Sequence, residues 1–415
     1  MRKILLLPLL ILCYGIFCQE NLKIMSYNVL NYPGTDTAVR NPYFRTVIRN
    51  TNPDILVVQE MQSQAGMNGF LSNVMNASGN NYSAGTFING PDSDNGIFFK
   101  TNKFIFISNT PIRTALRDIS EFKIIHTNYP SDTLHIYSVH LKASEGSTNE
   151  NLRAAEVDSL RKLTNSLPPG ALYIVLGDFN IYRSGEPAYI KLLEINQNNT
   201  GHFIDPIPNM TGTWNNPAYA EYHTQSPRVR SFGGGATGGM DDRFDMILNS
   251  PVISSTNGGI IYILNSLTPY GNDGDHYNDS INRRPNNAVP DSIADALHYA
   301  TDHLPVFATL RFGNTIGISI TSNEIPNSFT LEQNYPNPFN PSTIIRFELP
   351  VGAARRVALR VYDYLGREIT TLVNQQLHPG TYEVDFNAEK YSSGVYYYRL
   401  ETEHYTETRK MILIK

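Results

Sequence analysis

The sequence LYIVLGDFN, residues 172–180, is an apolar run that ends abruptly in a glycine, an aspartate and an asparagine. Short runs rich in β-branched and aromatic residues, bounded by turn-forming residues, are typical of buried strands. Asp178 and Asn180 therefore lie where a strand gives way to a turn. A polar residue at a strand end usually caps that turn, so this stretch alone does not identify a site.

Other apolar runs of the chain also end in, or begin with, side chains that can bind a ligand. These side chains are Asn28, Glu60, His140, Asp245 and the pair Asp302 and His303. A single histidine is more often structural than catalytic, and a single strand-end aspartate usually caps a turn. Their recurrence at one strand end after another instead favours a shared site.

The apolar runs predict a domain of strands mixed with helices. The expected strands are Leu22–Tyr27, Ile55–Gln59, Gly96–Phe99, Phe104–Ile107, Leu134–Val139, Leu172–Leu176, Phe244–Leu248 and Val306–Leu310. Helical spacing of apolar residues predicts one helix over 147–167, with Ser147 and Glu150 as a capping box, and a shorter one over 43–50. This mixture predicts an α/β sandwich of sheets covered by helices.

A second, smaller domain follows a boundary at residues 313–327. Its alternating runs predict strands at Thr343–Glu348, Val357–Asp363, Thr381–Phe386, Gly394–Glu401 and Glu407–Ile414. No cluster of His, Asp or Glu stands out there. The expected fold is a small all-β sandwich.

Composition excludes several classes of protein. Hydrophobic residues make up 41% of the 415 residues and charged residues 17%, which excludes a disordered chain or a coiled coil. The net charge of −5 leaves no basic footprint for non-specific nucleic-acid binding. A bound metal would supply positive charge locally instead.

Residues 1–18 are predicted to be a signal peptide. Arg2 and Lys3 precede an apolar run over 4–17 that is too short to span a bilayer comfortably. We expect cleavage after Cys18; lipid attachment at Cys18 and an uncleaved anchor are the alternatives. Both cysteines, Cys13 and Cys18, lie in this segment, and the mature chain has no second apolar run long enough to span a membrane.

Taken in order along residues 22–312, the strand-end motifs resemble the endonuclease/exonuclease/phosphatase superfamily, whose fold is DNase I-like. The motifs are SYNV at 26–29, QE at 59–60, VHL at 139–141, GDFN at 177–180, RFDMIL at 243–248 and DHLPV at 302–306. The resemblance implies two packed sheets flanked by helices, with a divalent-metal site that cleaves phosphate esters.

The resemblance implies that Mg²⁺ or Mn²⁺ is held by Asn28, Glu60 and Asp302. Carboxylate and amide oxygens suit such a hard cation, which stabilises charge that develops on phosphate oxygens. The DNA-repair branch of the superfamily has a further carboxylate two residues after the asparagine, where this chain has Leu30. Metal binding is therefore expected to depend on fewer groups.

The resemblance also implies roles for the other strand-end residues. Asp178 would orient and deprotonate the attacking water, and Asn180 would hold water or phosphate. His303, held by Asp245, would bind a phosphate oxygen as a cationic donor, because a neighbouring carboxylate favours the charged imidazole. His140 would be a second donor to the phosphate.

Two further acidic features leave alternatives open. Asp242 lies three residues before Asp245; we favour Asp245 as the histidine's partner because the apolar strand begins directly after it. Asp273, Asp275 and Asp279 could bind Ca²⁺ as a structural ion, but the loop lacks the terminal glutamate of an EF-hand, which favours a solvated loop.

The Gly-rich run at 233–239 is not a phosphate loop, because no Gly-Lys-Ser/Thr follows it.

The C-terminal region, residues 324–415, resembles the type A sorting domain of the bacterial type IX secretion system. The resemblance rests on NYPNPFNPST at 334–343, VYD with LGR at 361–367, GTY at 380–382 and SGVYY at 393–397. It implies export across both membranes and contact with the secretion machinery. The expected organisation is a signal peptide at 1–18, a catalytic domain at 21–312, a linker at 313–327 and a sorting domain at 328–415.

These features predict a secreted or surface-attached, metal-dependent phosphodiester hydrolase, with extracellular nucleic acid as the expected substrate. A sphingomyelinase-like or inositol-phosphatase-like activity is the alternative within the same class. A binding protein that kept the fold and lost activity is the alternative from another class. The joint presence of Glu60, Asp178, Asn180, Asp302 and His303 argues against it, because a pure binder needs no such set.

Overall fold

The computed structural model describes residues 19–168, 170–195, 200–207, 209–255, 259–313, 318–322, 326–350, 356–377, 379–389, 391–403 and 405–415. The predicted signal peptide, residues 1–18, lies outside the described residues. So do residues 314–317 and 323–325 of the predicted linker.

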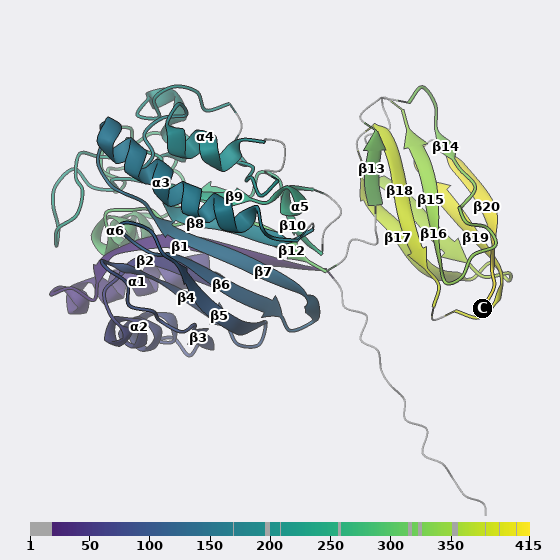
Figure 1. The fold of residues 1–415 in the computed structure, drawn as a ribbon, viewed down its shortest axis with the longest axis horizontal. Coiled ribbons are helices and arrows are strands. Elements are labelled where there is room, and N and C mark those ends of the chain that lie inside the picture. Colours follow the sequence, from purple (N-terminus) through teal and green to yellow (C-terminus); the bar gives the residue numbers. More distant parts are fainter. Residues whose placement is uncertain are drawn as a thin grey trace, which may run out of the picture.

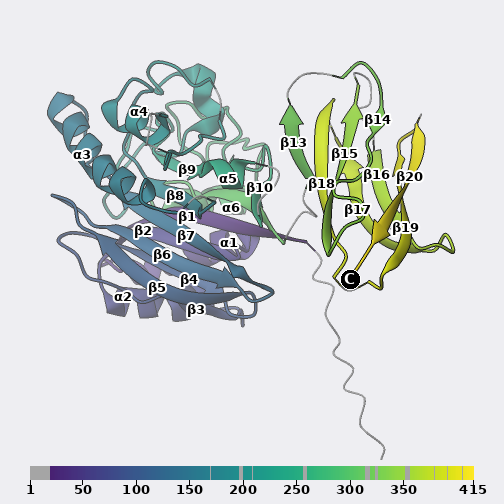
Figure 2. The same cartoon turned by 45° about the vertical axis from the view of Figure 1, so that its right-hand side comes forward.

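Two mixed sheets face each other in the larger domain (Figures 1 and 2). In the first sheet the strand order is β10-β12-β1-β2-β4-β3, and β11 pairs with β12. Its strands are β1 (Glu20–Tyr32), β2 (Ile55–Met61), β3 (Tyr82–Ala84), β4 (Asp94–Lys100), β10 (Ile260–Tyr262), β11 (Thr268–Pro269) and β12 (Val306–Phe312). Within this sheet β1 and β2 run parallel, so both strands end at the same edge.

The second sheet has the order β5-β6-β7-β8-β9. Its strands are β5 (Phe104–Ile112), β6 (Ile119–His126), β7 (Tyr129–His140), β8 (Leu172–Asp178) and β9 (Asp245–Asn249). The parallel pair β7 and β8 again ends at one edge, and the antiparallel β9 begins there.

Helices cover the outer face of each sheet (Figure 1). The first sheet is covered by α1 (Thr37–Thr51), α2 (Gln64–Phe70) with the short helix η1 (Leu71–Met75), and α6 (Asp291–Ala300). The second sheet is covered by α3 (Ser147–Thr164) and α4 (Pro187–Leu193), and the short helices η2 (Pro217–Tyr222) and α5 (Pro251–Ser254) lie in the connections around β9.

Alternation along the strands explains this layering. In β1, Leu22 and Ile24 point into the core between the two sheets, whereas Met25, Tyr27 and Val29 pack against the helices. Successive side chains of a strand point to opposite faces, so a strand buried on both faces is apolar throughout. Each fully buried large apolar side chain contributes about 1.5–3 kcal/mol. The expected α/β sandwich is confirmed.

Some local predictions were wrong. Helix α3 ends at Thr164, its N-cap residue is Gly146, and no capping box forms. Glu150 instead accepts a hydrogen bond from Arg183 at 2.6 Å. Strand β6 was not predicted, because Glu121 and Lys123 interrupt its apolar pattern. Glu121 is buried there and bonds to His135 and Tyr137, so tertiary contacts satisfy its charge.

The C-terminal region folds into two antiparallel sheets, as the sequence predicts. One sheet contains β13 (Ile318–Ser322), β14 (Thr330–Leu331), β15 (Ser342–Leu349) and β18 (Gly380–Asn387); the other contains β16 (Arg356–Tyr362), β17 (Glu368–Gln376), β19 (Gly394–Glu401) and β20 (Thr406–Leu413). Asn334, the first residue of the NYPNPFNPST motif, is buried; its amide donates to Pro336 O and to Thr343 Oγ1. Within the described residues, no helix is both long and apolar enough to cross a membrane.

Candidate active site

The strand ends of the two sheets bring the predicted residues together. In the register of β1 and β2, Asn28 lies opposite Gln59, so Glu60 follows at the same edge. In the second sheet, Asp178 lies opposite His140 on one side and opposite Asp245 on the other. The carboxyl ends of parallel strands, with the start of an antiparallel neighbour, therefore gather these polar groups.

Asn28 connects the two sheets. Its side-chain Nδ2 donates to Glu60 Oε1 at 3.0 Å and to Asp178 Oδ2 at 3.2 Å. The second carboxylate oxygen of Glu60 accepts from the backbone N–H of Asn31 at 2.9 Å. Asn28 is fully buried, so a single amide holds a carboxylate from each sheet in a fixed place.

His303 lies between two carboxylates. Its Nδ1 is 2.7 Å from Asp245 Oδ2, and its Nε2 is 3.6 Å from Asp178 Oδ2. Burial alone would lower the pKa of His303, but Asp245 and Asp178 outweigh burial and raise that pKa well above its usual value. The imidazole is therefore cationic at neutral pH, with Nδ1–H donating to Asp245.

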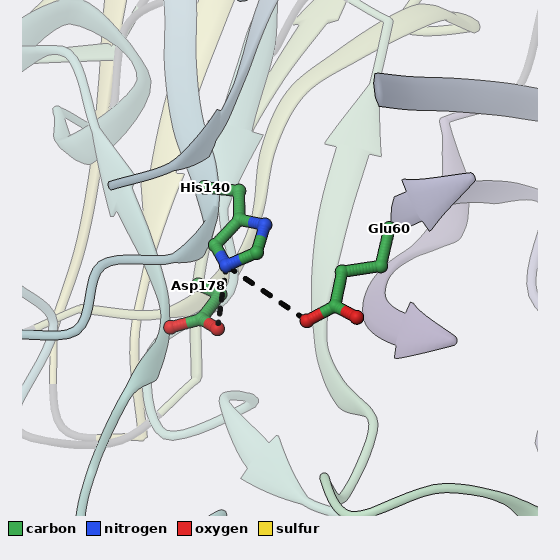
Figure 3. A group of neighbouring side chains, drawn as sticks. All are labelled: Glu60, His140 and Asp178. Carbon is green, nitrogen blue, oxygen red and sulfur yellow. Dashed lines mark ion pairs between the residues drawn. The ribbon is translucent and has the colours of Figure 1, made fainter. Parts of the chain in front are cut away.

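His140 completes a compact group with Glu60 and Asp178. Its Nε2 is 3.6 Å from Asp178 Oδ2 and 3.8 Å from Glu60 Oε1 (Figure 3). Burial, with the nearby charges of Arg117 and His303, lowers the pKa of His140 well below its usual value, so this ring is neutral. One ligand atom from each of the three side chains lies within 4.8 Å of the others, close enough to hold one metal ion.

Asp302 belongs to the same region but faces a loop. Its Oδ2 accepts a hydrogen bond from the backbone N–H of Ala236, and its charge raises the pKa of Glu60, second to burial. A Cβ on Gly235 would lie 2.5 Å from Asp302 Oδ2, so the Gly-rich loop can approach this carboxylate only without a side chain. The three side chains that could hold a metal are Glu60, His140 and Asp178. They share only Glu60 with the predicted ligands Asn28, Glu60 and Asp302.

The chemistry of these donors fits a hard divalent cation. Burial raises the pKa of Asp178 to about 7 and also raises the pKa of Glu60. The protein's own positive groups therefore do not fully balance the negative charge of these carboxylates. Carboxylate oxygens of this kind are the preferred ligands of Mg²⁺ and Mn²⁺. A bound cation would offset the repulsion between Glu60, Asp178 and Asp302.

The remaining predicted residue, Asn180, lies directly after Asp178. Its backbone N–H donates to Asp178 Oδ1 at 3.1 Å, and its side-chain amide donates to Leu141 O at 3.2 Å. Its φ of 49° is left-handed, a conformation that asparagine tolerates better than most residues. Both contacts fix the turn that follows β8.

Asp242 and the Asp273 loop stand apart from this centre. Asp245, not Asp242, contacts His303; burial, with Asp241 and Glu145, raises the pKa of Asp242 to about 7. Asp273 accepts hydrogen bonds from His276 and from two backbone N–H groups. The only group of three metal-binding side chains among the described residues is that of Glu60, so the calcium alternative gains no support.

Gln225 is a site residue that sequence reasoning missed. Its side-chain Nε2 lies 2.6 Å from His303 Nε2, the ring nitrogen that Asp245 does not use; because a cationic ring donates from Nε2, the amide oxygen of Gln225 must take that place to accept the bond. Gln225 comes from the long connection between α4 and β9, which has no periodic pattern. Nothing local in the sequence marks this contact, because the two residues are 78 positions apart.

Comparison with known families identifies both regions of the chain. The model of the Endonuclease/Exonuclease/phosphatase family matches residues 25–251. The Secretion system C-terminal sorting domain matches residues 333–415, so the protein carries a type IX sorting domain and is secreted or surface-attached. No curated protein matches the chain.

Solved structures of low sequence identity resemble the chain. Truncated TDP2 from Caenorhabditis elegans is 16% identical, covers 70% of this chain and 97% of its own, with a TM-score of 0.45. The human nocturnin catalytic domain with bound sulfate is 18% identical, with coverages of 70% and 94% and a TM-score of 0.42. An endonuclease/exonuclease/phosphatase from Bacteroides vulgatus is 12% identical, with coverages of 70% and 98% and a TM-score of 0.45.

The family match spans more than half of the 415 residues and includes the strands that carry Asn28, Glu60, His140, Asp178 and Asp245. On that basis, this chain belongs to the endonuclease/exonuclease/phosphatase family of phosphoesterases.

Proposed function

We propose that the protein is a secreted, divalent-metal-dependent phosphodiester hydrolase and that extracellular nucleic acid is its substrate. One observation carries the proposal: a buried carboxylate, Asp178, lies within 3.6 Å of two imidazoles and is hydrogen-bonded to Asn28. A carboxylate with a raised pKa beside a cationic imidazole provides a base and an acid in one site.

The metal would be held by Glu60, Asp302 and Asn28, with His140 and Asp178 close enough to share it. When bound, Mg²⁺ or Mn²⁺ would polarise the phosphoryl group and neutralise charge on its oxygens. Asn28 now presents its amide nitrogen to two carboxylates. Its oxygen accepts from the backbone N–H of Leu30, so a rotation of the amide would be needed for Asn28 to act as a ligand.

Asp178 is the proposed general base, which accepts a proton from the attacking water. Asn180, fixed directly after it, holds that water or a phosphate oxygen. His303 donates from Nε2 to a non-bridging phosphate oxygen, and Asp245 keeps the ring oriented and charged. His140 is a second, neutral donor to the phosphate.

One basic and two acidic residues near the site bear on the choice between the substrate candidates. The guanidinium of Arg117 acts electrostatically on His140, donates to Leu141 O at 3.3 Å and pairs with Asp92 at 2.9 Å; a substrate with further phosphates, such as DNA or RNA, would compete with Asp92 for this cation. Asp242 and Glu145 lie close to Tyr182, and both raise its pKa after burial. These carboxylates suit an ammonium group, which makes a phosphocholine-type diester the second candidate, although the Tyr182 ring itself already faces the guanidinium of Arg153 at 5.4 Å.

A substrate panel tests the proposal. Purified residues 19–415 are assayed on plasmid, single-stranded DNA, RNA, sphingomyelin and sugar phosphates, with and without chelator. We expect cleavage of nucleic acid that requires added Mg²⁺ or Mn²⁺. Preferred cleavage of sphingomyelin would support the second candidate, and full activity after exhaustive chelation would exclude the metal.

We further propose the domain boundaries: a signal peptide at 1–18, a catalytic domain at 21–312, a linker at 313–327 and a sorting domain at 328–415. The described β13 begins at Ile318, within the proposed linker, and pairs with β18 of the C-terminal region. A sorting domain beginning at residue 318 is the alternative that this pairing favours. Limited proteolysis with mass spectrometry of the fragments distinguishes the two boundaries.

A further inference from the structure

Arg40 is a buried arginine of α1 that binds backbone carbonyls from two distant segments. Its side chain is only 2% exposed. Nε donates to Ala300 O at 2.8 Å and Nη1 donates to Leu30 O at 2.9 Å, while Nη2 donates to Val29 O. Among the described residues, its carboxylate contact is with Asp36 Oδ1 and is longer, at 3.4 Å.

Both segments carry proposed metal ligands. Val29 and Leu30 directly follow Asn28, and Ala300 lies two residues before Asp302. The same segments are tied once more, because Thr301 Oγ1 donates to Asn28 O at 2.9 Å. Arg40 therefore connects the end of β1 to the end of α6 by hydrogen bonds, next to the proposed metal ligands Asn28 and Asp302.

The chain bulges after Asn28, where the pairing of β1 with β2 shifts register, and this turn needs such support. Leu30 has a φ of 46° and Asn31 a φ of 49°, both in the left-handed region that costs most residues energy. This turn also presents the Asn31 N–H to Glu60 Oε2. If the turn relaxed, the positions of both Asn28 and Glu60 would change.

We infer that Arg40 is a positioning residue that holds Asn28, Glu60 and Asp302 in the arrangement that binds the metal. This inference rests on the proposed metal-dependent function. Arg40 cannot be a ligand, since its guanidinium is positively charged and has no acceptor. A lysine cannot replace it, because three carbonyls in different directions match a rigid planar fork and not a single ammonium.

Arg161 provides a matched control. It is also a buried arginine, 5% exposed, and its Nη1 donates to Lys191 O at 2.6 Å and to Leu192 O at 2.9 Å. These carbonyls lie at the end of α4, which contributes no residue to the site. Arg161→Lys should therefore cost stability in the same way as Arg40→Lys without touching the metal site.

The experiment measures Mn²⁺ affinity, not turnover. Wild type, Arg40→Lys and Arg161→Lys of residues 19–415 are titrated with Mn²⁺, free ion is followed by electron paramagnetic resonance, and folding is monitored by circular dichroism and thermal unfolding. Groups that orient metal ligands typically contribute 10–100-fold to affinity. We expect Arg40→Lys to bind Mn²⁺ about 10–100-fold more weakly and Arg161→Lys to bind it as wild type does.

The outcomes separate the two claims. Equal affinity of wild type and Arg40→Lys, or equal losses in both lysine variants, would overturn the positioning role and leave the metal site standing. A wild type that binds no Mn²⁺ would remove the metal site and this role with it. If Arg40→Lys does not fold, Thr301→Val tests the same link between β1 and α6, because it removes the hydrogen bond to Asn28 O and the 3.3 Å contact with Asp302 Oδ1; weaker Mn²⁺ binding supports the positioning role of this link and unchanged binding overturns it.

Discussion

Replacing Asp245 with asparagine tests whether Asp245 and His303 act as one unit. The 2.7 Å contact joins two residues that are each 2% exposed. Removing one partner of a buried charge pair costs about 3–5 kcal/mol. That figure is a cost in stability; turnover should fall by part of the about 10²–10⁴-fold that a positioned acid contributes, because the imidazole loses the carboxylate that keeps it charged and oriented.

The assay is a double-mutant cycle on the preferred substrate from the panel. Turnover and substrate affinity are measured for wild type, Asp245→Asn, His303→Ala and the double variant, with circular dichroism as the control for folding. His303→Ala should slow turnover by about 10²–10⁴-fold. The double variant should be no slower than His303→Ala alone, because partners in one unit are not additive. Losses that multiply would refute the pairing.

Three further outcomes are expected. Glu60→Gln should raise the Mg²⁺ concentration for half-maximal activity at least about 10-fold while the unfolding midpoint stays close to that of wild type; a large stability loss with unchanged metal dependence would contradict the ligand role. Truncation after Gly313 should leave turnover intact and abolish export in the native host; a folded but inactive fragment, or normal export, would show that the tail has another role. Burial alone would raise the pKa of Asp205, but two 2.8 Å bonds from Arg243 outweigh it and lower the pKa. Their contribution to stability is therefore present above about pH 3.9 and lost as pH falls through the lowered pKa. Asp205→Asn should cost about 3–5 kcal/mol in urea unfolding at pH 7 and less in acid, whereas an equal cost at both pH values would argue against a charged pair.

The strand ends could be predicted from sequence because each is a local event. An apolar run that stops at a polar residue indicates both the strand and the edge of the sheet, which is why Glu60, Asp178 and His303 were found. The roles of these residues came from a family resemblance and stay predictions. The local pattern indicates where a residue lies in the fold. Its chemical role depends on the side chains around it, which come from other parts of the sequence.

The contacts between distant segments could not be predicted. Asn28 and Asp178 are 150 positions apart, and neither residue's surroundings in sequence indicate the hydrogen bond between them. The hydrogen bond from Arg40 to Ala300 could not be predicted either, since Ala300 is 260 positions away and offers only a backbone carbonyl. Strand β6 was missed for a related reason: a buried Glu121 is tolerated because His135 and Tyr137, from the next strand, bind it.

The most direct test of the proposed mechanism is the turnover of Asp178→Asn. The substitution keeps the shape of the side chain and removes the basic oxygen that would accept a proton from water. With saturating Mg²⁺, turnover should fall by about 10²–10⁴-fold while the substrate still binds with wild-type affinity. Unchanged turnover in a folded Asp178→Asn variant would contradict the mechanism.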